Sequence, residues 1–263
     1  MPTSPEPVGE ARRPPQHLVV RNLSAGYAGN LVVRDINVSV GAGEVAVVLG
    51  PNGSGKSTVM KAVTGQIEAV RGSVHVGGLD VTNKPSEQLA QLGMGYIPQD
   101  NDVFSPLTVH ENLLMGGALL SKREAAVRID EIYSRFPVLA RLRSSRGGRL
   151  SGGERKLLAM GRVLMLRPSL VVLDEPTANL SPGATRDVLA DHVKGLAEAG
   201  TAVLLVEQKA LQALEIADWA YILVAGAVEL EAPASELASR GDIGELFLGK
   251  VPVSSPRVQQ GEL

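Results

Sequence analysis

The sequence predicts an α/β protein whose core is a parallel β-sheet. Three short, unbroken apolar runs are typical of strands buried on both faces of such a sheet: Val45–Leu49, Leu170–Asp174 and Ala202–Val206. Segments with helical spacing of apolar residues lie between and after these runs, and this alternation indicates a parallel sheet with crossover connections. The 263 residues, 44% of them hydrophobic, suffice for one such core and a small additional subdomain.

The N-terminal part of the core is predicted to be rich in strands. Residues 1–16 are polar and Pro-rich, which is typical of a disordered leader, so order is expected to begin after them. Residues 17–23 and 31–40 are rich in Val and Leu, with Gly and Asn between the two stretches, and this predicts two strands. After the run Val45–Leu49, a Gly-rich turn leads into a helix that Gly65 ends.

A helical subdomain is predicted in the middle of the chain. A strand over residues 73–76 is followed by a polar connection, and residues 106–141 then have helical spacing of apolar positions, interrupted by Pro137. We expect a separate helical subdomain at about residues 100–152.

The α/β pattern returns after residue 151 and closes the predicted core. The helical run LLAMGRVLM ends before Pro168, and the last strand is WAYILV, which places Trp219 in the core. The main domain is predicted over residues 17–248, followed by a flexible tail at 249–263.

Composition excludes several classes of site. The absence of cysteine excludes disulfides, thiolate metal sites and cysteine nucleophiles. The net charge of −2 predicts no broad attraction to nucleic acid. No apolar run approaches the roughly 18 residues that span a bilayer, so a membrane role would depend on docking to another protein. The four histidines show no ligand spacing, which favours surface or core positions for them: His17, His75, His110 and His192.

A glycine-rich phosphate-binding loop is predicted directly after the first buried run. GPNGSGKS, residues 50–57, matches GxxxxGK[ST] between a strand and a helix, a context that argues against a chance glycine-rich turn. Main-chain N–H groups of such a loop and the helix N-terminus favour phosphate oxygens, while Lys56 reaches the β- and γ-phosphates and Ser57 ligates Mg²⁺. The predicted nucleotide-binding residues here are Gly50, Pro51, Asn52, Gly53, Ser54, Gly55, Lys56, Ser57 and Thr58.

Two carboxylates follow the second buried run. Asp174 ends that strand and is expected to hold Mg²⁺ beside the phosphates, and Glu175 is expected to orient or deprotonate the attacking water. An acidic strand end before a Pro turn is common by itself, so the assignment depends on its combination with Lys56 and Ser57.

A second anion site is predicted at LSGGE, residues 150–154. Ser151, Gly152 and Gly153 would present main-chain N–H groups at a helix N-terminus, and one nucleotide does not need two such sites on one chain. A head-to-tail pair of chains would use both. The alternative is a capping box between Ser151 and Glu154, and both interpretations are compatible.

GPNGSGKS, LSGGE and LVVLDEP occur in the order and spacing of ABC-type (ATP-binding cassette) ATPases, and the resemblance extends from about residue 18 to about residue 248. It implies a P-loop NTPase fold with a parallel-sheet core, an N-terminal antiparallel β subdomain and a helical subdomain. It also implies ATP hydrolysis with Mg²⁺ in a sandwich dimer. Tyr27 is similar to the aromatic residue that stacks on adenine in this family, although a lone Tyr also fits ordinary packing. Gln99 is similar to the glutamine that touches Mg²⁺ and the water, the alternative being a polar loop residue.

Two positions depart from the family pattern. Gln208 stands where the family usually has a His that contacts the γ-phosphate; since Gln carries no titratable proton, Glu175 would supply any base function alone. Ser181 replaces the usual Asp of the loop that faces the partner, which puts in doubt whether both sites of a dimer work alike.

Finer features resemble the ATPase of branched-chain amino-acid importers, a group that also handles urea and short amides. They are LLVEQ, LSGGERKLLAMGRVLM and VFSPLTVHENLLMGG. The resemblance implies a peripheral subunit on the cytoplasmic face of the inner membrane, working with a like or unlike cassette, permease subunits and, indirectly, a solute-binding protein. We expect the permease to dock near residues 99–107, with Phe104 and Leu107 as candidate groove residues.

Three alternatives stay open at this point. The lipopolysaccharide-exporter and iron–sulfur-assembly types share the compact length, whereas DNA-repair types carry a long coiled coil and ribosome factors carry two cassettes. A nucleotide-binding regulator without turnover is a further alternative, against which Glu175 argues.

Overall fold

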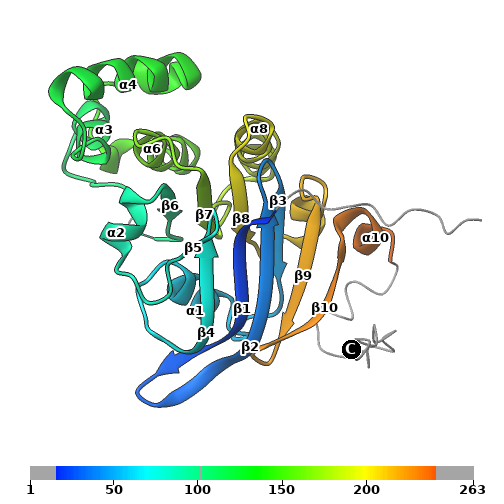
Figure 1. Ribbon diagram of the computed structural model, residues 1–263. Coiled ribbons are helices and arrows are strands. Elements are labelled where there is room, and N and C mark those ends of the chain that lie inside the picture. The colour runs from blue at the N-terminus through cyan, green and yellow to red at the C-terminus, as the bar shows by residue number, and fades with distance from the viewer. Residues whose placement is uncertain (1–15, 101, 241–263) are drawn as a thin grey trace, which may run out of the picture.

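Two β-sheets and a group of helices make up residues 16–100 and 102–240, the part of the chain that this computed structural model describes (Figure 1). The predicted leader, apart from Gln16, and the predicted tail lie outside these residues. The strands are β1 (Gln16–Tyr27), β2 (Asn30–Gly41), β3 (Val45–Leu49), β4 (Ala69–Val76), β5 (Leu79–Asp80), β6 (Met94–Ile97), β7 (Leu170–Asp174), β8 (Ala202–Val206), β9 (Trp219–Val224) and β10 (Ala227–Pro233).

Helices connect and cover these strands. They are α1 (Lys56–Val63), α2 (Ser86–Gln91), α3 (Val109–Gly116), α4 (Lys122–Arg135), α5 (Pro137–Arg141), the 3₁₀ turn η1 (Gly147–Arg149), α6 (Gly152–Leu164), α7 (Pro182–Arg186), the π-helical stretch η2 (Asp187–Val193), α8 (Lys194–Glu198), α9 (Ala210–Leu214) and α10 (Ala234–Ala238). No helix in residues 16–100 or 102–240 combines the length and apolar character needed to cross a bilayer.

The larger sheet has six strands in the order β10-β9-β3-β8-β7-β6. Its inner pairs are parallel, and only β10 at one edge runs antiparallel to its neighbour β9. All residues of β3, β7 and β8 are buried, which confirms the three apolar runs as central strands of a parallel sheet.

The smaller sheet is antiparallel, with strand order β2-β1-β4-β5, and confirms the predicted N-terminal β subdomain. Its first two strands are longer than the sequence indicated and pair from Gln16 with Gly41 to Tyr27 with Asn30. Tyr27 therefore lies at the tip of a hairpin, next to a two-residue turn.

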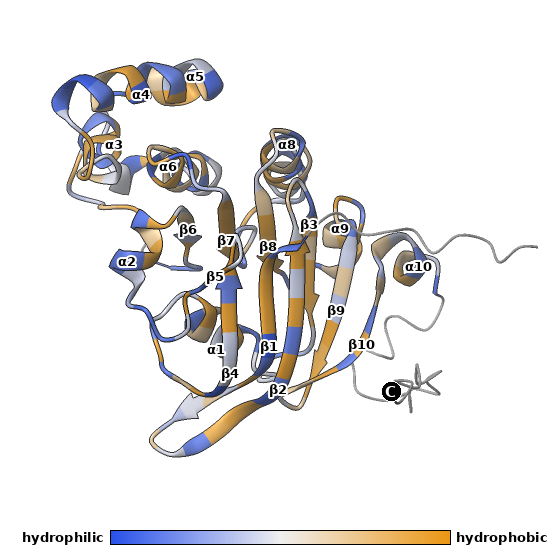
Figure 2. Cartoon of the chain, in the orientation of Figure 1, coloured by the Kyte–Doolittle hydropathy of each residue, from blue (hydrophilic) through white to orange (hydrophobic). Residues whose placement is uncertain are grey.

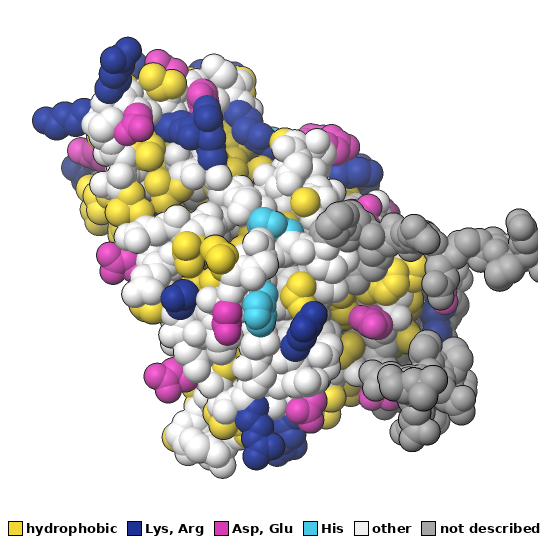
Figure 3. Space-filling view, in the orientation of Figure 1, with side chains coloured by type: hydrophobic (Ala, Val, Ile, Leu, Met, Phe, Trp, Pro, Cys, Tyr) yellow, Lys and Arg dark blue, Asp and Glu magenta, His cyan; other side chains and the backbone are white. Residues whose placement is uncertain are grey.

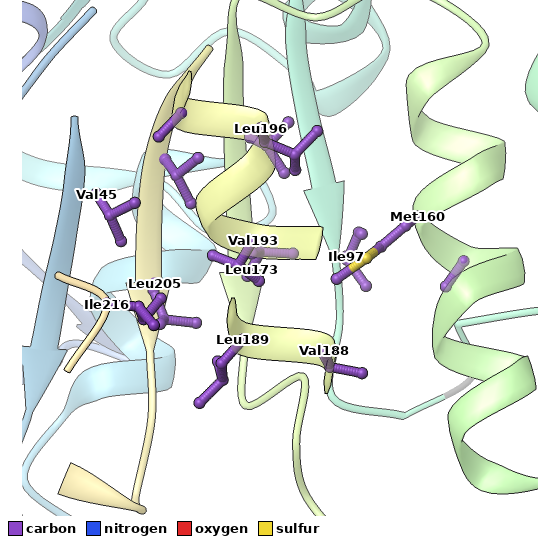
Figure 4. Packing of buried hydrophobic residues seen from close by; sticks show 14 of the residues in the cluster. Val45, Ile97, Met160, Leu173, Val188, Leu189, Val193, Leu196, Leu205 and Ile216 are labelled. Carbon is purple, nitrogen blue, oxygen red and sulfur yellow. The ribbon is translucent and has the colours of Figure 1, made fainter. Parts of the chain in front are cut away.

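Two hydrophobic clusters lie on opposite faces of the larger sheet. Along β3, Val45, Val47 and Leu49 belong to the cluster on the helical side, whereas Ala46 and Val48 belong to the cluster shared with the smaller sheet. Figure 4 shows the first cluster, in which side chains of the sheet meet those of η2, α8 and α6. Because side chains alternate along a strand, each central strand contributes to the hydrophobic core on both faces of the sheet.

The middle of the chain is helical between β6 and β7. The helices α3, α4 and α5 lie at one side of the molecule, beyond α6, and hydrophilic and hydrophobic residues alternate along α4 (Figure 2). Its buried residues, Ala125, Ile129 and Ile132, recur at helical spacing and join the cluster that α6 also enters. Trp219, predicted as core, is only partly buried and packs beside the second cluster.

Candidate functional site

The phosphate loop follows β3 at the carboxyl edge of the parallel sheet, where ligands of open α/β sheets bind. A Cβ on Gly50 would lie 2.1 Å from the main-chain oxygen of Leu223, and one on Gly55, at φ +104°, would lie 2.5 Å from Val33 Cγ1. Only glycine fits at these two positions, because the loop passes so close to β9 and β2. The loop is held against the β9–β10 turn by a hydrogen bond from Gly226 N to Ser54 O, at 2.9 Å.

Lys56 begins α1 and points back over the loop. Its Nζ donates to the main-chain oxygens of Gly50, at 2.8 Å, and Pro51, at 3.1 Å. Burial lowers the pKa of Lys56, and the charges of Glu175 and Asp174 oppose this shift. The charges of both carboxylates thus act on this ammonium, as expected for three groups of one site. The roles predicted for Gly50–Thr58 toward phosphate remain predictions.

Asp174 and Glu175 leave β7 at the same sheet edge, and both are buried. Glu175 has φ +47°, a conformation that non-glycine residues rarely adopt, and its main-chain N–H donates to Val206 O at 2.9 Å. Its carboxylate accepts from Gln208, whose Nε2 lies 2.9 Å from each of the two oxygens. The structure thus brings together two of the predicted catalytic residues, Glu175 and Gln208.

Asp174 suits a cation. Burial and, to a lesser degree, the neighbouring Glu175 raise the pKa of Asp174 to about 6, while Lys56 lowers it. Its Oδ1 is buried and accepts no hydrogen bond from the described part of the chain. No group of three His, Cys, Asp or Glu side chains within residues 16–100 and 102–240 could hold a metal ion by itself. This donor set fits Mg²⁺, which typically takes one carboxylate and a hydroxyl and completes its shell with phosphate and water oxygens.

Tyr27 is 44% exposed at the tip of the β1–β2 hairpin. The ammonium of Lys61 on α1 lies 5.8 Å from the centre of its ring, so the ring stands beside the helix that follows the phosphate loop. An exposed aromatic face in this place is compatible with stacking on a base, which stays a prediction.

Gln99 follows β6 and is half-buried. Its main-chain oxygen accepts from Lys156 Nζ at 2.9 Å, and the same ammonium forms an ion pair with Asp102 at 2.8 Å. The structure therefore ties the segment at Gln99 to α6. Gln99 also lines a cavity of about 450 Å³ together with Gly152 and Asn179.

The predicted second anion site lies at the start of α6, which Figure 1 shows well apart from α1. Ser151 caps this helix: its Oγ accepts from Glu154 N at 3.3 Å, and Glu154 Oε2 accepts from Ser151 N at 2.8 Å. The capping box is thereby confirmed. Ser151 is exposed, and Gly152 and Gly153 are half-buried. Their role toward a second nucleotide stays a prediction.

Sequence reasoning missed two groups of buried or partly buried charges near the site. One is the pair Lys156 and Asp102; a lysine among the buried positions of α6 was the available signal. The other is Glu207 and Lys209, which flank Gln208. Glu207 is 1% exposed, which raises its pKa, and its Oε1 accepts from Thr177 N at 3.0 Å. No sequence pattern identified the partners of these two residues.

Comparison with known proteins gives one matching family, described as ABC transporter, over residues 33–178. Among solved structures, the fold is similar to a nucleotide-free ATP-binding cassette from an ABC transporter, with a TM-score of 0.80 and 27% identity, covering 88% of this chain and 98% of that chain.

Curated relatives are similar over nearly the full described length. The chain is 38% identical over 229 residues to a probable branched-chain amino acid transport ATP-binding protein, LivF, of Archaeoglobus fulgidus, which covers 87% of this chain and 97% of that protein. It is 35% identical over 227 residues to the high-affinity branched-chain amino acid transport ATP-binding protein BraG of Pseudomonas aeruginosa, covering 86% and 97%. It is 30% identical over 238 residues to the lipopolysaccharide export system ATP-binding protein LptB of Escherichia coli, covering 89% and 97%.

Proposed function

We propose an import role for this chain, which belongs to the ABC transporter family and is one of its ATP-hydrolysing ATP-binding proteins. In this role, the chain powers the import of branched-chain amino acids or related small solutes such as urea and short amides. The observation that carries the substrate class is the higher identity to two branched-chain amino acid transport proteins, 38% and 35%, than to a lipopolysaccharide exporter, 30%. The sequence features LLVEQ and VFSPLTVHENLLMGG favour the same group.

In the proposed mechanism, the main-chain N–H groups of Gly50–Ser57 bind the β- and γ-phosphates of ATP, and Lys56 exchanges its contacts with Gly50 and Pro51 for phosphate oxygens. Ser57, Asp174 and Gln99 would hold Mg²⁺, which supplies neutralisation of the charge that develops on the phosphate oxygens. Tyr27 would stack on the base.

Glu175 is the proposed general base. Its carboxylate, oriented by the two contacts from Gln208, would accept a proton from the attacking water. Gln208 contributes a neutral donor and no proton of its own, so the proton-transfer role falls to Glu175 alone.

ATP-binding cassettes of this family form dimers and work with membrane permease components. We propose that Ser151, Gly152 and Gly153 of one cassette cap the γ-phosphate held by the other, which is either a second copy or a related chain. Closure on ATP and reopening after hydrolysis would pass through the helical subdomain, at about residues 100–152, to the permease on the cytoplasmic face of the membrane. A solute-binding protein would take part indirectly, and no nucleic acid is involved.

Exposed apolar side chains support a docking surface on the helical subdomain. Figure 3 shows hydrophobic side chains gathered over α3, where the large exposed residues are Leu114 and Met115, followed by Leu119. Phe104 is 43% exposed nearby in sequence and stacks with the Arg162 guanidinium, 4.3 Å from the ring centre. Apolar area of this kind is typical of a protein–protein contact.

The test is reconstitution of the chain in vesicles with permease subunits and a solute-binding protein of the branched-chain amino-acid importer type. Vesicles that contain all components should accumulate labelled leucine, or urea or a short amide, only when ATP and the binding protein are supplied. A Lys56→Ala variant should lose both ATP turnover and uptake. A different result would contradict import and favour the exporter alternative: the rate of ATP turnover would not respond to any solute-loaded binding protein, but it would rise with a lipopolysaccharide-type permease.

A further inference from the structure

The residues on either side of Gln208 hold a second segment of the site. This segment, residues 175–185, consists of the loop between β7 and α7 and the first four residues of α7, and it is called here the β7–α7 connection. Glu207 accepts from Thr177 N at 3.0 Å, and Gln208 donates to Glu175 at 2.9 Å. These two contacts anchor the beginning of the connection to the end of β8.

Lys209 anchors the rest of the connection. Its Nζ donates to Thr177 O at 3.1 Å, to Leu180 O at 3.3 Å and to Thr185 Oγ1 at 2.7 Å. An ammonium group has three N–H donors, so these three acceptors use all of them. Thr185 is fully buried. The ammonium of Lys209 therefore binds both ends of the nine-residue stretch 177–185.

The connection reaches the start of α6 through Leu180. A Cβ on Gly152 would lie 2.9 Å from Leu180 Cδ2, so the leucine side chain packs directly over that glycine. Leu180 and Asn179 also form one wall of the cavity of about 450 Å³ whose other walls include Gly152 and Gln99. A contact path thus runs from Glu175 and Gln208 through Lys209 and Leu180 to Gly152.

We propose that Lys209 is a positioning residue that couples the two phosphate-binding sites of a single chain. By holding the β7–α7 connection, it keeps Glu175 in place at one end and Leu180 against Gly152 at the other. The inference rests on the proposed function, because the segment Ser151–Gly153 serves a nucleotide only in a pair of cassettes. It goes beyond that function because it names Lys209 as the residue that links the position of Glu175 to the position of Ser151–Gly153 in the same chain.

The physical basis is the adjacency of the two anchors. Gln208 and Lys209 are consecutive, so a main-chain movement that releases Gln208 from Glu175 also moves the ammonium that holds Leu180. A role of Lys209 confined to local stability would predict loosening of the connection alone. The coupling role predicts that the start of α6, which Lys209 does not contact, responds as well.

The test is amide hydrogen exchange of the full chain, followed by mass spectrometry, in the parent and in Lys209→Met. Exchange should be about tenfold or more faster over residues 177–185 and also over residues 151–154, with β3 and β8 unchanged. The affinity for ADP should stay within about twofold, because the acceptors of Lys209 lie outside the phosphate loop. Turnover should show a lower kcat with little change in KM for ATP.

Two further variants make the outcome decisive. Leu180→Ala should speed exchange over residues 151–154 while the contacts of Lys209 to Thr177 and Thr185 remain, and it serves if Lys209→Met fails to fold. Lys194→Met, at an exposed lysine of α8, is the matched control and should change nothing. Unchanged exchange over residues 151–154 in a folded Lys209→Met overturns the inference, and so does unchanged exchange there in Leu180→Ala if Lys209→Met does not fold. Failure of the parent to bind ADP would instead count against the proposed function, and the exchange comparison without nucleotide would still decide the coupling.

Discussion

Gln208 Nε2 lies 2.9 Å from both carboxylate oxygens of Glu175, so one amide nitrogen bridges the two oxygens of the proposed base. A histidine in this position would change charge near neutral pH, whereas an amide does not. We therefore expect Gln208→Ala to lower kcat by about tenfold, the loss of one charge-assisted hydrogen bond, with little change in KM. Steady-state ATPase rates over a range of ATP concentrations measure this, and a rise in KM without loss of kcat would assign Gln208 to nucleotide binding instead.

Removal of the Glu175 charge should stop proton transfer but spare nucleotide binding. Glu175→Gln keeps the shape of the side chain, so ATP hydrolysis should slow by about 10²–10⁴-fold while ATP is retained. Single-turnover hydrolysis and filter binding separate the two effects. Glu198→Gln, at an exposed glutamate of α8, is the control. An unchanged single-turnover rate in Glu175→Gln would refute the assigned base.

The raised pKa of Asp174 predicts a pH dependence of stability in the absence of Mg²⁺. Its folded-state value of about 6 lies above the usual value for an unfolded Asp, so the folded protein binds more protons between about pH 4 and pH 6. Protonation of Asp174 therefore adds to the free energy of unfolding at low pH, and this contribution should be lost as pH rises through that window. Asp174→Asn should remove this pH dependence. Urea unfolding in EDTA at several pH values measures it. Parallel curves for the parent and Asp174→Asn would contradict the assignment.

The ion pair of Lys156 and Asp102 predicts strong dependence of stability on both partners. Their side chains are 7% and 6% exposed, and removal of one leaves the other buried and unpaired. Lys156→Met should cost about 3–5 kcal/mol in the free energy of unfolding, and Asp102→Asn in the same chain should restore much of it. Denaturant titrations of the single and double variants give the coupling energy, and additive effects would show that the pair does not act as a unit.

Phe104→Asp should separate transport from hydrolysis. The exposed ring contributes apolar area to the proposed docking surface, and an Asp in its place faces Arg162, which can pair with it, so the fold should tolerate the change. ATPase activity of the purified chain should survive while uptake by the reconstituted system is lost. Equal loss of both activities would count against the docking surface.

The sequence was informative where a strand is buried on both sides and ends in a chemical motif. Val45–Leu49 and Leu170–Asp174 are continuous apolar runs, and each leads directly into the residues that bind or hydrolyse nucleotide in the proposed mechanism. Tyr27 and Gln99 came only from family resemblance, because a lone Tyr or Gln carries no pattern of its own.

The remaining contacts depend on distances across the fold that composition does not encode. Lys209 finds its acceptors 24 to 32 residues earlier in the chain, and two of them are main-chain oxygens, which any residue type supplies. The antiparallel edge strand β10 and the π-helical stretch η2 were missed for a related reason. Short half-buried strands and local changes of helical pitch leave little periodic signal.

Alternate side chains of β3 pack into two different cores, so the packing in each core independently determines the register of this strand. Deletion of one residue within Val45–Leu49 would turn every later side chain of the strand to the opposite face and would also shift the phosphate loop by one position. Loss of packing on one face would then entail loss on the other, so the two sheets should melt in a single calorimetric transition rather than as separate units.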